Sequence, residues 1–233
     1  MASPVGCDGR ILPMINAHLD THAGYTDGSD KERLISVAKE LKLDENNEWV
    51  IRPDEEIQIG SDCRVGLALC LYVANHMNYP VKLLFTVQEE IGRLGVAYSL
   101  EHSKPFFENT SFALVLDRHS SEGNDIIHSY HGRIMAPVAM LNNIERISAS
   151  LMYPMIRRAS PRCADAYSLS LAGIKTVYLS CEIWSEHSKC DRVNIQEAVN
   201  TLQVVRNCIE MNENLLKSGT TDEHVTSRMC AEV

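Results

Sequence analysis

The chain has 233 residues, of which 45% are hydrophobic and 23% charged, as is typical of a globular protein with one large α/β domain or two small ones. Its net charge of −9, from 31 acidic and 22 basic residues, argues against nucleic acid or an anionic membrane as a main partner. The longest apolar run is too short to cross a bilayer, and the N-terminal MASPVGCDGR lacks the apolar core of a secretory signal. Because the eight cysteines include no CxxC pair, we expect free thiols and a cytoplasmic protein.

The first predicted element is a buried strand over residues 11–20, ILPMINAHLD, which ends in His18 and Asp20. Two residues apart on a strand, these side chains point to the same face, so one could bind a metal ion while the other orients it. A solvated surface pair is the alternative interpretation. The polar stretch that follows predicts an amphipathic helix over 30–43 and a strand over 49–52, without a chemical signal.

The next informative stretch is residues 57–77, IQIGSDCRVGLALCLYVANHM. It predicts a short strand that reaches Gly60, a turn with Asp62, and an apolar helix over 64–77. An aspartate between a strand and a helix is often a plain N-cap. It is also well placed to bind a ligand, and the residues alone leave both interpretations open.

Residues 81–92, VKLLFTVQEEIG, predict a strand that is buried on both faces and ends in Glu89 and Glu90. In an open α/β sheet, ligands bind just beyond the carboxyl ends of the strands, so paired acids there suggest an active site. The alternative is a solvated strand end followed by a helix whose first turn favours acids.

In the rest of the chain helix and strand alternate, and two further strand ends carry metal-type side chains. The buried strand over 112–117 ends in Asp117, and the strand over 176–181 is followed by His187. Asn194 and Glu197 form a capping box that opens the last helix. The other predicted elements are helices over 92–102, 133–151, 163–172 and 194–216, and a strand over 125–130.

Metal-type side chains thus follow five predicted strands, namely His18, Asp62, Glu89 with Glu90, Asp117 and His187. Histidines and carboxylates without cysteine suit zinc or a related borderline ion. So many acids in one cleft would repel each other, and two divalent cations sharing a carboxylate remove that problem. Such ions lower the pKa of a bridging water toward ~7, and a carboxylate that is not a ligand can take its proton.

Several motifs together resemble the co-catalytic di-zinc exopeptidases. The resemblance is closest to the glutamyl and tetrahedral aminopeptidases, with the carboxypeptidase-type deacylases next. The matching segments are AHLDT at 17–21, GSDCRVG at 60–66, QEEIG at 88–92, LD at 116–117 and EHSKCDRVN at 186–194. The resemblance implies an α/β fold, a three-layer αβα sandwich around a mixed, mostly parallel sheet.

The resemblance also implies a role for each residue. His18 and Asp117 would bind one divalent ion, Glu90 and His187 the other, and Asp62 would bridge the two. Glu89 would be the general base, and Asp20 would orient His18. The ions would be zinc, with cobalt or manganese as alternatives. Neighbouring side chains at a strand end point apart, so Glu89 and Glu90 should have different roles. Only the resemblance indicates which of them is the base and which is the ligand.

The chain also departs from these enzymes. Their bridging aspartate is usually followed by Asp or Asn in a cis peptide. This chain has Cys63 there, and because a cis non-proline bond costs ~3 kcal/mol we expect a different turn. No stretch is long enough for their lid or oligomerisation insert, so we predict a single catalytic domain over 1–216 and a polar tail over 217–233. Its groove could be open, or it could be completed by a partner chain, such as a second copy in a homo-oligomer.

Three functions remain open. The first is an aminopeptidase that acts on peptide N-termini through a metal-bridging hydroxide. The second is a di-metal deacylase of N-acyl amino acids, which would use the same ligands. The third is a catalytically inactive relative or regulatory subunit, suggested by Cys63 and the short N-terminal segment. A cysteine hydrolase that uses Cys63 is more remote, because no histidine is paired with it by sequence.

Overall fold

A seven-stranded mixed sheet forms the centre of the protein in this computed structural model, which describes residues 9–21, 40–43, 49–52, 59–117, 124–160, 164–188 and 190–218. The strands lie in the order β4-β1-β5-β9-β6-β7, and β8 also pairs with β6. Pairing is parallel from β4 to β9 and between β6 and β8, whereas β6 runs antiparallel to β9 and β7. The strands are β1 (Leu12–His18), β4 (Lys82–Thr86), β5 (Thr110–Asp117), β6 (Asp125–Tyr130), β7 (Arg133–Ile134), β8 (Ile156–Ser160) and β9 (Thr176–Ser180).

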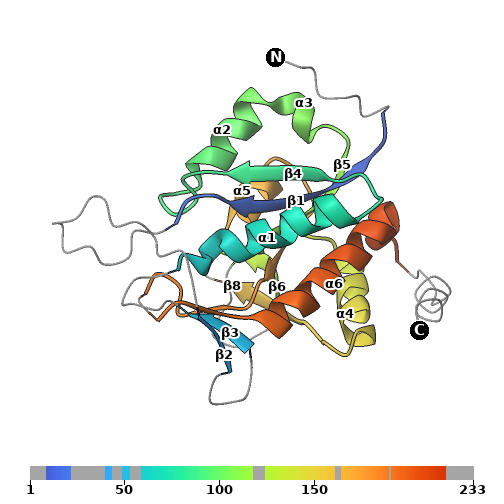
Figure 1. Ribbon diagram of the computed structural model, residues 1–233. Coiled ribbons are helices and arrows are strands. Elements are labelled where there is room, and N and C mark those ends of the chain that lie inside the picture. Colours follow the sequence, from blue (N-terminus) through green and yellow to red (C-terminus); the bar gives the residue numbers. More distant parts are fainter. Residues whose placement is uncertain are drawn as a thin grey trace.

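Helices cover both faces of this sheet (Figure 1). They are α1 (Ser61–His76), α2 (Leu94–His102), α3 (Lys104–Phe107), α4 (Val138–Ser150), α5 (Asp165–Leu171) and α6 (Ile195–Met211), which continues into the 3-10 turn η1 (Asn212–Leu216). On β1, Ile15 packs into a core with α1, α4 and α6, whereas its neighbour Met14 packs into a second core with α2 and α5. Because successive strand side chains point to opposite faces, these two cores define three layers, which confirms the predicted α/β sandwich.

The register of the parallel strands brings the predicted site residues to one edge. His18, the last residue of β1, is paired with Thr86 at the end of β4. Asp117, the last residue of β5, is paired with Ser180 at the end of β9. The carboxyl ends of these central strands therefore form the edge at which an α/β sheet binds its ligands.

A second, antiparallel sheet lies beside this edge. Its strands follow the order β10 (Ile183–Trp184), β11 (Arg192–Asn194), β3 (Trp49–Arg52) and β2 (Glu40–Leu43). The strand predicted over 49–52 is confirmed, but the helix predicted over 30–43 is wrong at 40–43, which pair with β3. Residues 30–39 of that helix lie outside the described part of the chain. The connection between β10 and β11 carries His187.

The capping box predicted for the last helix is present on the Asn194 side, because Asn194 Oδ1 accepts a hydrogen bond from Glu197 N at 3.1 Å. α6 ends at Met211, and η1 completes the predicted helical span to Leu216. Most of the predicted tail, residues 219–233, lies outside the described residues. Within the described chain, none of the helices combines the length and the apolar character that a bilayer crossing requires.

Candidate metal centre

His18 presents one ring nitrogen to a cluster of acids. Its side chain is only 2% exposed at the end of β1. Nδ1 lies 2.9 Å from the backbone oxygen of Asp20, and because a carbonyl can only accept, Nδ1 carries the hydrogen. In the neutral ring the lone pair is then on Nε2, which lies 2.9 Å from Asp62 Oδ1 and 3.5 Å from Asp117 Oδ1. This tautomer is the one that a metal-binding histidine needs.

Asp62 divides its two carboxylate oxygens between two histidines. Oδ1 faces His18, and Oδ2 lies 3.0 Å from Nε2 of His187, whose loop is far from β1 in sequence. The same His187 nitrogen lies 2.8 Å from Oε1 of Glu90. Asp62 is buried and is the residue that the two halves of the cluster share.

The metal-type ligand atoms form two overlapping groups. His18, Asp62, Cys63 and Asp117 make the first, and Asp62, Glu90 and His187 make the second. Within each group all ligand atoms lie within 4.8 Å of one another. The structure thus brings together the five residues that the sequence predicts as metal ligands. Each group could hold a divalent ion, and the Asp62 carboxylate is common to both groups.

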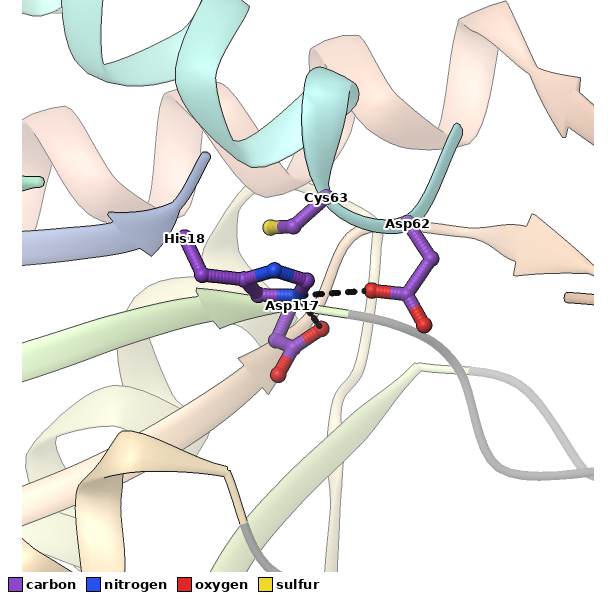
Figure 2. A group of neighbouring side chains, drawn as sticks. All are labelled: His18, Asp62, Cys63 and Asp117. Atoms are coloured by element: carbon purple, nitrogen blue, oxygen red, sulfur yellow. Dashed lines mark hydrogen bonds and ion pairs between the residues drawn. The ribbon is translucent and has the colours of Figure 1, made fainter. Parts of the chain in front are cut away.

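Cys63 is the member of the first group that the sequence prediction omits. Its thiol is buried and donates a hydrogen bond to the backbone oxygen of Leu116 at 2.8 Å. Figure 2 shows the sulfur pointing to the His18 side and away from the Asp62 carboxylate. The peptide between Asp62 and Cys63 is cis, so the prediction of a different turn is wrong. A Cβ on Gly66, one helical turn on, would collide with Leu116 O and the Cys63 sulfur, which explains the glycine in this close approach of α1 to β5.

Asp20 ties the two acids of the QEE segment to the end of β1. Its Oδ1 accepts a hydrogen bond from Glu89 N at 3.1 Å, and its Oδ2 accepts one from Glu90 N at 3.2 Å. Asp20 meets His18 chiefly through its backbone oxygen, since its carboxylate lies 3.5 Å from Nδ1. The carboxylate therefore positions the backbone of Glu89 and Glu90, a contact that the sequence analysis missed.

Glu89 differs from Glu90 in its surroundings. Among the described residues, Glu90 belongs to the second group of ligand atoms, whereas Glu89 belongs to neither. Burial, and next the charge of Asp117, raise the pKa of Glu89 to about 8. A carboxylate with a pKa near neutrality can exchange a proton at the pH of the cell.

The charges of the cluster balance one another through protons on the histidines. Burial alone would raise the pKa of Asp62, but hydrogen bonds with His18 and His187 hold it well below its usual value. Burial alone would lower the pKa of His18, but Asp117 and Asp62 raise it far above its usual value. The hydrogen bonds of His187 with Asp62 and Glu90 raise its pKa to about 9. Without metal ions, protons thus occupy the nitrogens that an ion would bind.

The affinity for the ion that His187 would bind should therefore rise with pH up to about 9, because His187 must lose its proton before Nε2 can bind an ion. Each unit of pH below that value should weaken binding about tenfold for every proton displaced. Chelator competition between pH 6.5 and 9 measures this slope. His102→Ala, at an exposed histidine of α2, is the control and should keep the slope. A flat profile for the unmodified protein would contradict this linkage.

Several solved structures share this architecture, among them aminopeptidases and a tripeptidase. Aminopeptidase PepT from Bacillus cereus is 14% identical with a TM-score of 0.62, and the match covers 90% of this chain and 82% of that chain. A tripeptidase from Staphylococcus aureus is 12% identical with a TM-score of 0.65, covering 89% of this chain and 82% of that one. The TET aminopeptidase from a marine Thaumarchaeota archaeon is 16% identical with a TM-score of 0.56, covering 75% of this chain and 54% of that one.

The chain shares the fold of these two aminopeptidases and this tripeptidase. At these identities the likeness extends to the fold alone. No family model matches the sequence, and no curated protein matches it either. The chain spans about half of the TET aminopeptidase chain. The strand register places the cluster of histidines and carboxylates at the carboxyl ends of the parallel strands, where open α/β sheets bind their ligands.

Proposed function

We propose that the protein is a metal-dependent aminopeptidase that removes the N-terminal residue of peptides. One observation carries this proposal: the two oxygens of the buried Asp62 carboxylate face two different histidines, each with a second acid beside it. That geometry fits two divalent ions, one held by His18 and Asp117 and one by Glu90 and His187. The fold shared with solved aminopeptidases and a tripeptidase supports peptide as the substrate class.

The donor set fits two such ions chemically. Imidazole and carboxylate donors suit zinc, with cobalt and manganese as alternatives. The Cys63 thiol is not counted among the donors, because it donates a hydrogen bond to Leu116 O. The acids of the cluster are buried or half-buried, and divalent cations offset their mutual repulsion. When bound, the ions polarise the scissile carbonyl and lower the pKa of a bound water toward ~7.

Glu89 would act as the general base. Its carboxylate is outside both groups of ligand atoms, and its pKa is raised by burial, so it can take a proton from the attacking water and pass it to the leaving amine. Asp20 would support this step by fixing the backbone of Glu89 and Glu90. The neutral His18 tautomer, held by the backbone oxygen of Asp20, would keep Nε2 directed at the first ion.

The test is hydrolysis by protein stripped of metal and then reloaded with zinc, cobalt or manganese. The substrates are peptides with free N-termini, the same peptides acetylated, and N-acyl amino acids. We expect release of the first residue from free N-termini only, and loss of activity with a chelator. Release of acyl groups with peptides untouched would replace this proposal by a deacylase. Two bound ions with no turnover of any substrate would indicate an inactive relative.

The homo-oligomer predicted from the sequence remains a prediction, and sedimentation of the loaded protein tests it. A second copy would matter for the substrate groove, because the sequence predicts a single domain without a lid or an oligomerisation insert.

A further inference from the structure

The loop that carries His187 has an unusual backbone conformation. The loop joins β10 to β11, and both Ser185 and His187 have left-handed backbone angles, with φ of 54° and 59°. Residues other than glycine rarely adopt this backbone conformation unless the surrounding structure holds it. Within the loop, Ser188 Oγ donates to Ser185 O at 2.6 Å, and Asp191 N donates to Ser188 O at 3.2 Å. These local bonds shape the turn but do not attach it to the rest of the site.

Asp191 makes that attachment. Its side chain is 1% exposed, although it lies in a surface connection. Oδ2 accepts a hydrogen bond from the backbone nitrogen of Ser61 at 3.0 Å, and Oδ1 accepts one from the Ser61 hydroxyl. One carboxylate thus joins the loop of His187 to the turn that begins α1, although 130 positions of sequence separate Asp191 from Ser61.

The position of this attachment connects it to the candidate site. Ser61 directly precedes Asp62, and Asp191 lies four residues after His187. The 3.0 Å contact between Asp62 Oδ2 and His187 Nε2 is therefore spanned by a second, parallel link through Ser61 and Asp191. A single link between two segments restricts their separation but leaves them free to rotate about it. Two links restrict both the separation and the relative rotation.

Burying this carboxylate carries a cost that its hydrogen bonds only partly offset. Burial raises the pKa of Asp191 despite the hydrogen bonds from Ser61, and the neighbouring charge of Asp62 adds to the rise. An acid placed beside another acid is poorly suited to stabilising the fold alone, but a cation bound at Asp62 would favour both charges.

We propose that Asp191 is a positioning residue for the metal ion that Glu90 and His187 would bind, because it fixes the His187 loop against the turn that carries Asp62. It acts in this way only if the proposed pair of ions is bound. Mutation of a residue that supports a metal ligand usually lowers the metal affinity by about 10–100-fold, and we expect an effect in that range for Asp191. Its effect should be confined to the ion that His187 binds.

The experiment is a stepwise titration of the metal-free full chain with cobalt, followed by visible absorption and chelator competition, which resolve two dissociation constants. His187→Ala identifies the binding step that depends on the loop. Asp191→Asn should weaken that same step by about 10–100-fold and leave the other unchanged. Ser61→Ala, which removes only the hydroxyl donor, should weaken it less. It also serves as the second variant if Asp191→Asn folds poorly.

The control is Asn143→Ala, which breaks another buried tether. Asn143 Nδ2 donates to Leu215 O at 2.8 Å and to Lys217 O at 3.0 Å, near the amino end of β5 and away from the cluster. It should lower thermal stability while leaving both cobalt constants unchanged. Equal affinities in Asp191→Asn and the unmodified protein, or equal weakening of both steps, would overturn the role of Asp191 alone. An unmodified protein that binds no cobalt would overturn this role together with the proposed function.

Discussion

Glu89→Gln should lower kcat by about 100- to 10,000-fold, the usual contribution of a general base, while both ions stay bound. Glutamine keeps the shape of the side chain but cannot take a proton from water at neutral pH. The ligand atoms should be unaffected, because among the described residues Glu89 belongs to neither group of ligand atoms. Its backbone nitrogen would still donate to Asp20. Steady-state hydrolysis of a free peptide, with metal content determined on the same sample, measures the effect.

The matched control is Glu101→Gln, the same substitution at an exposed position of α2. It should change neither kcat nor the metal content. Turnover near that of the unmodified protein in Glu89→Gln would show that another group takes the proton. Loss of one ion in Glu89→Gln would instead make Glu89 a ligand and reverse the roles proposed for Glu89 and Glu90.

The fold and most of the candidate cluster could be predicted because their signals are local. Runs such as LVLD over 114–117 contain apolar residues that a strand needs when both faces are covered, and they stop at an acid. Parallel strands of one sheet end at the same edge, so ligand-type residues at several strand ends converge without any knowledge of the loops. His18, Asp117 and the pair of Glu89 and Glu90 can be grouped in this way from the sequence.

The contacts that the sequence does not reveal are those between segments that meet only in three dimensions. The carboxylate of Asp20 lies 69 positions from Glu89, and nothing in either segment signals that one accepts from the backbone of the other. The same holds for Asp191 and Ser61. For residues 40–43 the error has a different cause, because spacing alone suits an amphipathic helix, whereas pairing with β3 decides the strand.

Asp62→Ala should remove both ions. Asp117→Ala should mainly weaken the binding of the ion that His18 and Asp117 would hold. Asp62 faces His18 with one oxygen and His187 with the other, so both proposed ion positions lose a ligand at once. Because even outer contacts of metal sites change affinity by about 10–100-fold, losing the shared ligand should cost more than about 100-fold at each position. Equilibrium dialysis with zinc gives the number of ions bound by each variant.

Thermal unfolding provides a second, independent measurement of the same loss. A ligand that binds only the folded state stabilises it by about 2.7 kcal/mol at a concentration of 100 times its Kd. The Tm of the unmodified protein should therefore rise when zinc is added, and the Tm of Asp62→Ala should not. Asp117→Ala should keep part of the rise, because Asp62, Glu90 and His187 remain together. If Asp62→Ala kept one ion at its original affinity, Asp62 would belong to one position only, and the two-ion centre would reduce to separate sites.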